Sequence, residues 1–122
     1  MRFLDEVVRL EDGRVTCRGV IREDNPLLDG RCLPTWALVE FLAQAAAVLH
    51  ALEDMEGSAG GPGYLVSVRE TALAAATPVV GEEIEVSVRR ESQRGRFLVL
   101  EGVVLGAAGQ LCRGRIGVVT LA

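Results

Sequence analysis

The chain has 122 residues and a net charge of −4, and its composition, 49% hydrophobic and 25% charged, is typical of a globular protein. That length provides for one hydrophobic core, so we expect a single domain over residues 1–122. The negative charge gives no attraction to phosphate backbones or anionic lipids, which argues against nucleic acid and membrane surfaces as partners.

The reactive side chains exclude further classes of chemistry. All the basic residues are arginine, so neither a Schiff-base lysine nor a P-loop lysine is available. Cys17, Cys32 and Cys112 are odd in number and have no CxxC spacing, which predicts neither a disulfide framework nor a metal site. The N-terminus interleaves charged and apolar residues, unlike a signal peptide. We expect a reduced, cytoplasmic protein with no cofactor.

The first two segments in chain order, residues 2–13 and 14–24, are rich in β-branched residues and are separated by the turn signal Asp12-Gly13. They predict an opening turn or strand, followed by a strand. Residues 25–34 break this pattern with Pro26, Gly30 and Pro34, and Pro34 suits the first turn of a helix.

A helix is predicted from about Pro34 to Met55, ending before the glycine-rich linker GSAGGPG. Its apolar run approaches the length of a membrane span. Glu40 and Gln44 near its middle would be unfavourable in hydrocarbon, so a buried core helix is the better interpretation.

Every later segment is strand-like, and turn signals separate residues 64–73, 82–92, 95–107 and 110–121. Ile84, Val86 and Val88 alternate with polar residues, as in a sheet with one wet face. A helix that is apolar all round must be enclosed. We therefore predict an α+β fold in which an antiparallel sheet of about five or six strands wraps one long central helix.

Three segments, FLDEV, LPTWALVEFLAQAAA and ATPVVGEEIEVSV, together with the element order, resemble the hotdog fold. More narrowly, the chain resembles 3-hydroxyacyl-carrier-protein dehydratases, especially the shorter dehydratase-like proteins of aryl-polyene gene clusters. The resemblance covers nearly the whole chain. It implies an acyl thioester of a carrier protein or coenzyme A as the substrate, in fatty acid or polyene biosynthesis.

Glu40 is the unusual residue of the helix, because a carboxylate taken out of water needs a partner or a chemical task. Gln44 lies one helical turn later and can hold that carboxylate. The resemblance implies that Glu40 faces the other subunit of a dimer. We assign Glu40 and Gln44 as catalytic residues. The candidate substrate-binding residues are Pro34, Thr35, Trp36, Ala43, Ala47 and Gly63. Alternatively, backbone donors or an arginine, Arg31 or Arg69, hold a purely structural Glu40.

The dehydratases that this chain resembles carry a histidine just before the helix, and the corresponding residues 25–34 contain none. His50, the only histidine, lies about 15 Å further along the helix and on a different face from Glu40, so it is not expected to be its intrachain partner. Asp24, Asp29 and Cys32 are the remaining loop candidates, although turn residues and an inert thiol are the commoner roles.

Three functions stay open on this evidence. The first is a dehydratase with an atypical partner for Glu40, and the second is an acyl thioesterase, which needs no loop histidine. The third is a non-catalytic subunit or acyl-binding module whose partner supplies the histidine. In each case we expect a homodimer or a heterodimer with a related hotdog subunit, because strand edges and an apolar groove require cover. The arginine-rich segment RRESQRGR predicts a solvated hairpin that can also touch an acidic carrier protein.

Overall fold

The computed structural model describes residues 3–54, 63–74 and 77–120. One long helix, α1 (Leu38–Asp54), is combined with six strands in the predicted order. The strands are β1 (Glu6–Glu11), β2 (Arg14–Val20), β3 (Gly63–Leu73), β4 (Glu83–Arg94), β5 (Phe97–Gly106) and β6 (Gly109–Thr120). The predicted helix end at Met55 and all of the glycine-rich linker except Gly63 lie outside the described residues.

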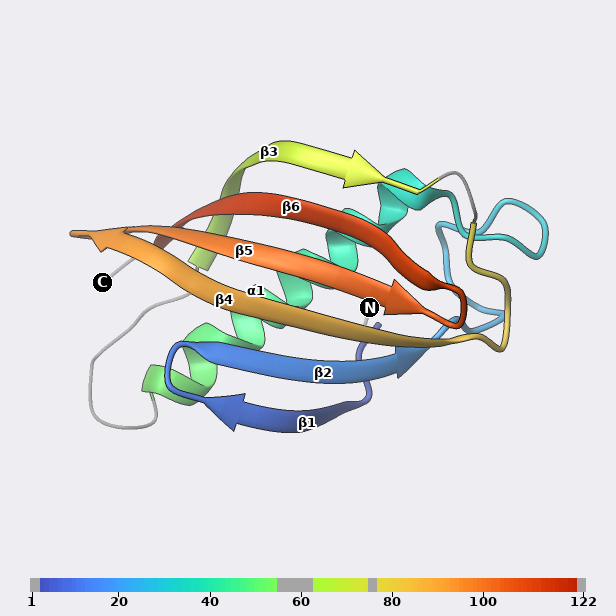
Figure 1. The fold of residues 1–122 in the computed structure, drawn as a ribbon, viewed down its shortest axis with the longest axis horizontal. Coiled ribbons are helices and arrows are strands. Elements are labelled where there is room, and N and C mark those ends of the chain that lie inside the picture. The colour runs from blue at the N-terminus through green and yellow to red at the C-terminus, as the bar shows by residue number, and fades with distance from the viewer. Residues whose placement is uncertain (1–2, 55–62, 75–76, 121–122) are drawn as a thin grey trace.

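The six strands form one antiparallel sheet in the order β1-β2-β4-β5-β6-β3, with α1 crossing one face (Figure 1). Asp12-Gly13 makes the β1–β2 turn, as predicted, and Gly13 has the positive φ of 73° that glycine tolerates best. The arginine-rich segment 89–96 forms the β4–β5 hairpin. β1 and β3 are left as the two edges, and all six residues of β1 are exposed.

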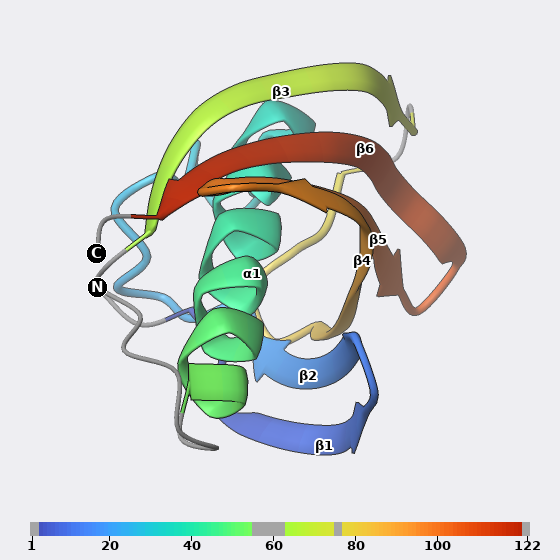
Figure 2. The same ribbon diagram turned by 90° about the vertical axis from the view of Figure 1, so that its left-hand side faces the viewer.

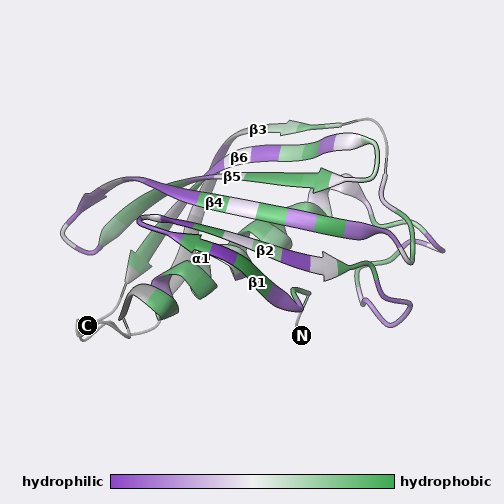
Figure 3. Cartoon of the chain, turned by 60° about the horizontal axis from the view of Figure 1, so that its bottom comes forward, coloured by the Kyte–Doolittle hydropathy of each residue, from purple (hydrophilic) through white to green (hydrophobic). Residues whose placement is uncertain are grey.

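The sheet curves around α1, which lies in its concave side (Figure 2). The predicted alternation of apolar and polar residues in β4 is confirmed, because Ile84, Val86 and Val88 are fully buried. Hydrophilic and hydrophobic residues alternate along β4 in Figure 3. β5 has the same period of two, because Leu98, Leu100 and Val104 are buried. The predicted fold, a central helix enclosed by an antiparallel sheet, is confirmed.

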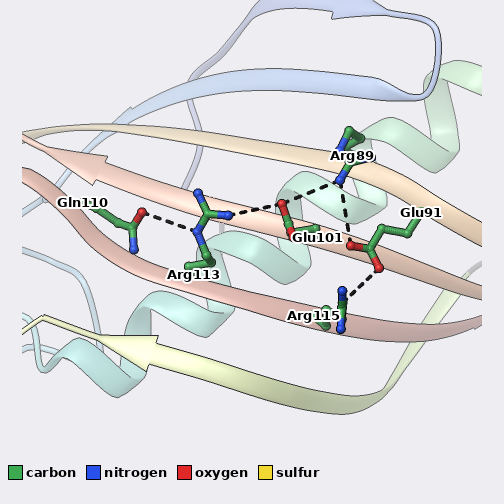
Figure 4. A network of polar contacts seen from close by, with 6 residues as sticks. All are labelled: Arg89, Glu91, Glu101, Gln110, Arg113 and Arg115. Atoms are coloured by element: carbon green, nitrogen blue, oxygen red, sulfur yellow. Dashed lines mark hydrogen bonds and ion pairs between the residues drawn. The ribbon is translucent and has the colours of Figure 1, made fainter.

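A network of ion pairs crosses the outer face of this sheet (Figure 4). Glu101 on β5 lies 3.8 Å from Arg89 on β4 and 3.4 Å from Arg113 on β6. Glu91 lies 3.9 Å from Arg89 and 2.9 Å from Arg115. Two half-buried carboxylates therefore tie three strands together on the face away from α1.

Helix and sheet approach closely at Gly102, in the middle of β5. A methyl group at this position would lie 2.6 Å from Cδ2 of Leu42 on α1 and 3.0 Å from Cγ1 of Val88. Both distances are shorter than van der Waals contact, so the absent side chain lets the helix settle onto the sheet.

Gly102→Ala is expected to lower the free energy of unfolding by about 1–3 kcal/mol, as overpacking of a filled core does. Because Leu42 supplies the worst contact, the same substitution should cost less in a Leu42→Ala background. Urea unfolding of the two single variants and the double variant measures this coupling. An equal cost in both backgrounds would contradict the close helix–sheet contact.

Candidate functional site at the start of the helix

The helix begins in a short 3₁₀ turn, η1 (Thr35–Ala37), which runs directly into α1. Pro34 precedes the turn, and its carbonyl accepts a hydrogen bond of 2.9 Å from the Ala37 N–H. The Leu33 N–H donates to the Pro78 carbonyl at 2.8 Å, which fastens the helix start to the loop before β4. Pro34 therefore opens the helix as predicted, although the first turn is 3₁₀.

α1 has two unlike faces. Leu38, Phe41 and Leu42 are fully buried against the sheet. The opposite side carries the exposed side chains of Glu40 and Ala47, and Trp36 in the preceding 3₁₀ turn is 61% exposed. In Figure 2 the described strands lie on one side of α1.

The expectation of a buried Glu40 is therefore wrong for the single chain. The sheet covers one side of the helix, and Glu40 lies on the other, among small residues such as Ala43 and Ala47. Its position in the first turn of α1 also suits a carboxylate, because the helix N-terminus carries partial positive charge.

Gln44 connects Glu40 to the beginning of the chain. Its side-chain N–H donates to Oε1 of Glu40 at 3.2 Å, and its own Oε1 accepts from the backbone N–H of Phe3 at 2.8 Å. The predicted Glu40–Gln44 contact is confirmed by this geometry. The Phe3 donor is new, and no side-chain pattern could have revealed it, because a backbone group supplies the bond.

An arginine does not hold Glu40 within the described part of the chain. Arg31 lies 3.9 Å from Glu23, and Arg69 is an exposed residue of β3. No arginine among the described residues lies within 4.0 Å of the Glu40 carboxylate. The alternative of an intrachain Arg31 or Arg69 pair is therefore wrong.

The other predicted site residues divide into two groups. Thr35 and Trp36 lie at the helix start, about one turn before Glu40, and Ala43 and Ala47 continue its face. Gly63 is the first residue of β3, where it pairs with Thr120 of β6. The helix candidates thus lie within about three helical turns of one another, whereas Gly63 belongs to a strand.

The remaining candidates, which are the loop residues Asp24, Asp29 and Cys32 and the helix residue His50, lie away from Glu40 in the chain. Asp24 and Asp29 are exposed. The backbone N–H groups of Asp29 and Cys32 donate to each other's carbonyls at 2.8 and 3.2 Å, around Gly30 with its φ of 64°. This closed turn explains the loop without a catalytic role. His50 is half-buried on α1, about 15 Å along the axis from Glu40.

A cavity of about 570 Å³ lies away from this site, on the outer face of the sheet, and its lining includes Arg18, Glu83 and Glu85. Glu40 is not among its lining residues. In the part of the chain that the structure describes, the Glu40 side chain is exposed.

Comparison with known proteins decides the family. The profile of the ApeP-like family, described as ApeP dehydratase, matches residues 1–121. The chain belongs to this family. No curated protein matches the sequence. The family confirms the resemblance drawn from the helix and strand motifs.

Solved structures share the fold of this family member. One is the dehydratase heterocomplex ApeI:P from Xenorhabdus doucetiae, with 23% identity over 99% of this chain and 84% of the other, and a TM-score of 0.87. A hypothetical thioesterase with coenzyme A from Streptococcus pneumoniae TIGR4 is 12% identical over 96% and 85% of the two chains, with a TM-score of 0.74.

A third is a mutant of the phenylacetic acid degradation protein PaaI from Thermus thermophilus, with 18% identity, coverage of 95% and 92%, and a TM-score of 0.71. At these identities the likeness shows a shared fold.

Residues 35–52 are long and apolar enough to cross a membrane by length and composition, but the core helix of a soluble protein meets the same criteria. Leu38, Phe41 and Leu42 of α1 are buried in the core of the chain.

The three cysteines are expected to differ in reactivity. Burial raises the pKa of the Cys17 and Cys112 thiols, so less thiolate forms at a given pH, whereas Cys32 is only half-buried. A disulfide reagent at neutral pH should modify Cys32 first and the other two only on unfolding. Cys32→Ser should abolish the fast phase, and a fast phase that persists in this variant would contradict the burial of Cys17 and Cys112.

Proposed function

We propose that the chain is a single hotdog domain that works as one subunit of a cytoplasmic dehydratase acting on 3-hydroxyacyl thioesters. Glu40 supplies one of the two proton-transfer groups. The observation that carries the proposal is the Glu40–Gln44 pair, hydrogen-bonded at 3.2 Å on the helix face that the chain's own sheet leaves open. Membership of a dehydratase family supports the reaction class.

Dehydration removes a proton from the carbon next to the thioester carbonyl and expels the hydroxyl group from the neighbouring carbon as water, leaving a double bond. It needs a base, an acid and hydrogen-bond donors for the enolate-like oxygen. The backbone N–H groups of Thr35 and Trp36 are suitable donors, because the first N–H groups of a helix have no partner within it. Ala43 and Ala47 leave room for a slender acyl chain beside Glu40.

The second proton-transfer group is assigned to a partner subunit, since residues 25–34 contain no histidine. The dehydratase heterocomplex ApeI:P has a chain of similar fold, and it supports this arrangement. The exposed Trp36 and the edge strands offer the surface that a related subunit would cover. A hotdog thioesterase structure with coenzyme A supports an acyl thioester as the ligand.

An acyl thioesterase is the second candidate. Its support is the likeness to the hypothetical thioesterase and the absence of a loop histidine, because a helix carboxylate can activate water alone. A non-catalytic acyl-binding subunit is the third. Mass spectrometry of purified protein with 3-hydroxyacyl-carrier-protein and acyl-coenzyme A substrates, with and without a related hotdog subunit, separates the three. Loss of water identifies a dehydratase and thioester cleavage identifies a thioesterase. No reaction identifies a non-catalytic acyl-binding subunit.

Glu40→Gln keeps the volume of the side chain and removes its charge. Turnover should fall by roughly a hundredfold or more, the scale of a lost general acid or base. The free energy of unfolding should fall by no more than about 1 kcal/mol, the value of a carboxylate near a helix N-terminus. Glu83→Gln, which neutralises an exposed carboxylate on β4, is the matched control and should leave both quantities unchanged.

Unchanged turnover of Glu40→Gln, combined with a large drop in melting temperature, would show that Glu40 is structural. That outcome corresponds to about 3–5 kcal/mol, the cost of stranding the partner of a buried ion pair in the assembled protein.

A further inference from the structure

We propose that the N-terminal segment, residues 3–5, positions the Glu40 site through the Gln44 amide. The inference rests on the proposed function of Glu40 and deepens it. Residues 3–5 lie outside the helix and before β1, yet the backbone N–H of Phe3 reaches Oε1 of Gln44 at 2.8 Å. Phe3 is thus a positioning residue, which acts on Glu40 through Gln44.

The bond from Phe3 fixes which way the Gln44 amide points. A primary amide has an accepting oxygen at one end and two donating N–H groups at the other. Since the oxygen is held by the Phe3 N–H, the nitrogen is turned toward Glu40, and it donates to Oε1 of Glu40 at 3.2 Å. The Phe3 backbone therefore selects the amide orientation in which the Gln44 N–H faces the Glu40 carboxylate.

Phe3 is itself held in place by the core. It is only 5% exposed, and its ring lies 5.0 Å from the ring of Phe41, at an interplanar angle of 46°. Phe41 is fully buried and directly follows Glu40. The same segment thus contacts the helix at two residues close to Glu40, by a ring contact at Phe41 and a hydrogen bond at Gln44.

Gly19 on β2 makes this path possible. A methyl group at Gly19 would lie 2.3 Å from the Phe3 carbonyl oxygen and 3.3 Å from Cα of Leu4. Both are backbone atoms, so the segment would have to shift as a whole. Beyond Leu4 the path is fixed by the Asp5 N–H, which donates to the Arg18 carbonyl at 2.8 Å, and by the Asp5–Arg22 ion pair.

The first test uses NMR to follow the Phe3 amide and the Gln44 side chain, and it requires no enzymatic activity. In the wild-type assembly the Phe3 amide should exchange slowly with solvent in NMR. Gln44→Met removes the acceptor and should speed that exchange, whereas Glu40→Gln should not. Gly19→Ala should shift the side-chain amide resonances of Gln44. Val15→Ala, a buried change on the same strand, should leave those resonances in place while lowering stability.

The second test measures kinetics. Gly19→Ala should lower kcat about tenfold to a hundredfold with little change in KM, because a small displacement of a reacting group costs rate rather than binding. If Gly19→Ala and Gln44→Met both disturb Glu40 through the Gln44 amide, Gly19→Ala should have almost no further effect on kcat in a Gln44→Met background. Val15→Ala should retain the wild-type kcat.

Three results would overturn the inference. The Phe3 amide could stay protected in Gln44→Met, or the Gln44 resonances could stay in place in a folded Gly19→Ala variant. The third is a double variant, Gly19→Ala with Gln44→Met, whose loss of kcat equals the product of the two single losses. Should Gly19→Ala fail to fold, Arg22→Gln, which breaks the exposed ion pair to Asp5, tests the same path and should shift the same Gln44 resonances. Absence of turnover in the wild type would refute the proposed function, and the exchange and resonance measurements would still decide whether residues 3–5 position Gln44.

Discussion

The geometry of this protein depends on one constraint: a single curved sheet can cover only one side of a helix. α1 presents Leu38, Phe41 and Leu42 to the concave face, and Gly102 on β5 lets it sit close to the strands. Its opposite side is also largely apolar but remains outside the sheet. An uncovered apolar helix face is costly in water, so it favours association with a second chain.

That constraint gives Glu40 its significance. In one chain the carboxylate is an exposed side chain near a helix N-terminus, which is an ordinary and favourable place for a negative charge. A subunit that covers Trp36 and the alanines would take the same carboxylate out of water. Gln44 and the N-terminal segment already hold it in one orientation, so the site would be partly organised before the partner arrives. In a dehydratase family member without a loop histidine, such an assembly also offers a source for the missing proton-transfer group.

Much of the fold could be predicted from the sequence because its signals are local. The period of two in β4, the Asp12-Gly13 turn and the long apolar run of α1 each depend on neighbouring residues. The orientation of the helix could not be predicted in the same way. Alanines at 43 and 47 are apolar without being large, so composition makes the helix look enclosed all round. Only the large residues, Leu38, Phe41, Leu42 and Leu49, mark the side that the sheet covers.

The site was predictable to a similar degree. A spacing of four residues on a helix brings Glu40 and Gln44 together, and the structure has them in contact. The Phe3 contribution was out of reach, because a backbone N–H donates across 41 positions in the chain and leaves no trace in residue types. Gly63 was grouped with the helix residues, and it lies on β3 instead of on α1.

The central claim, that a second chain covers the Glu40 face of α1, is tested most directly with Trp36, the only tryptophan of the protein. It is 61% exposed in the single chain and lies in the 3₁₀ turn about one helical turn before Glu40. Acrylamide quenching of its fluorescence should be measured together with light scattering, for the chain alone across a dilution series and with a related hotdog subunit. The account predicts that association moves the emission to shorter wavelength and reduces quenching several-fold. An assembled protein whose Trp36 is quenched as readily as in the isolated chain would contradict it.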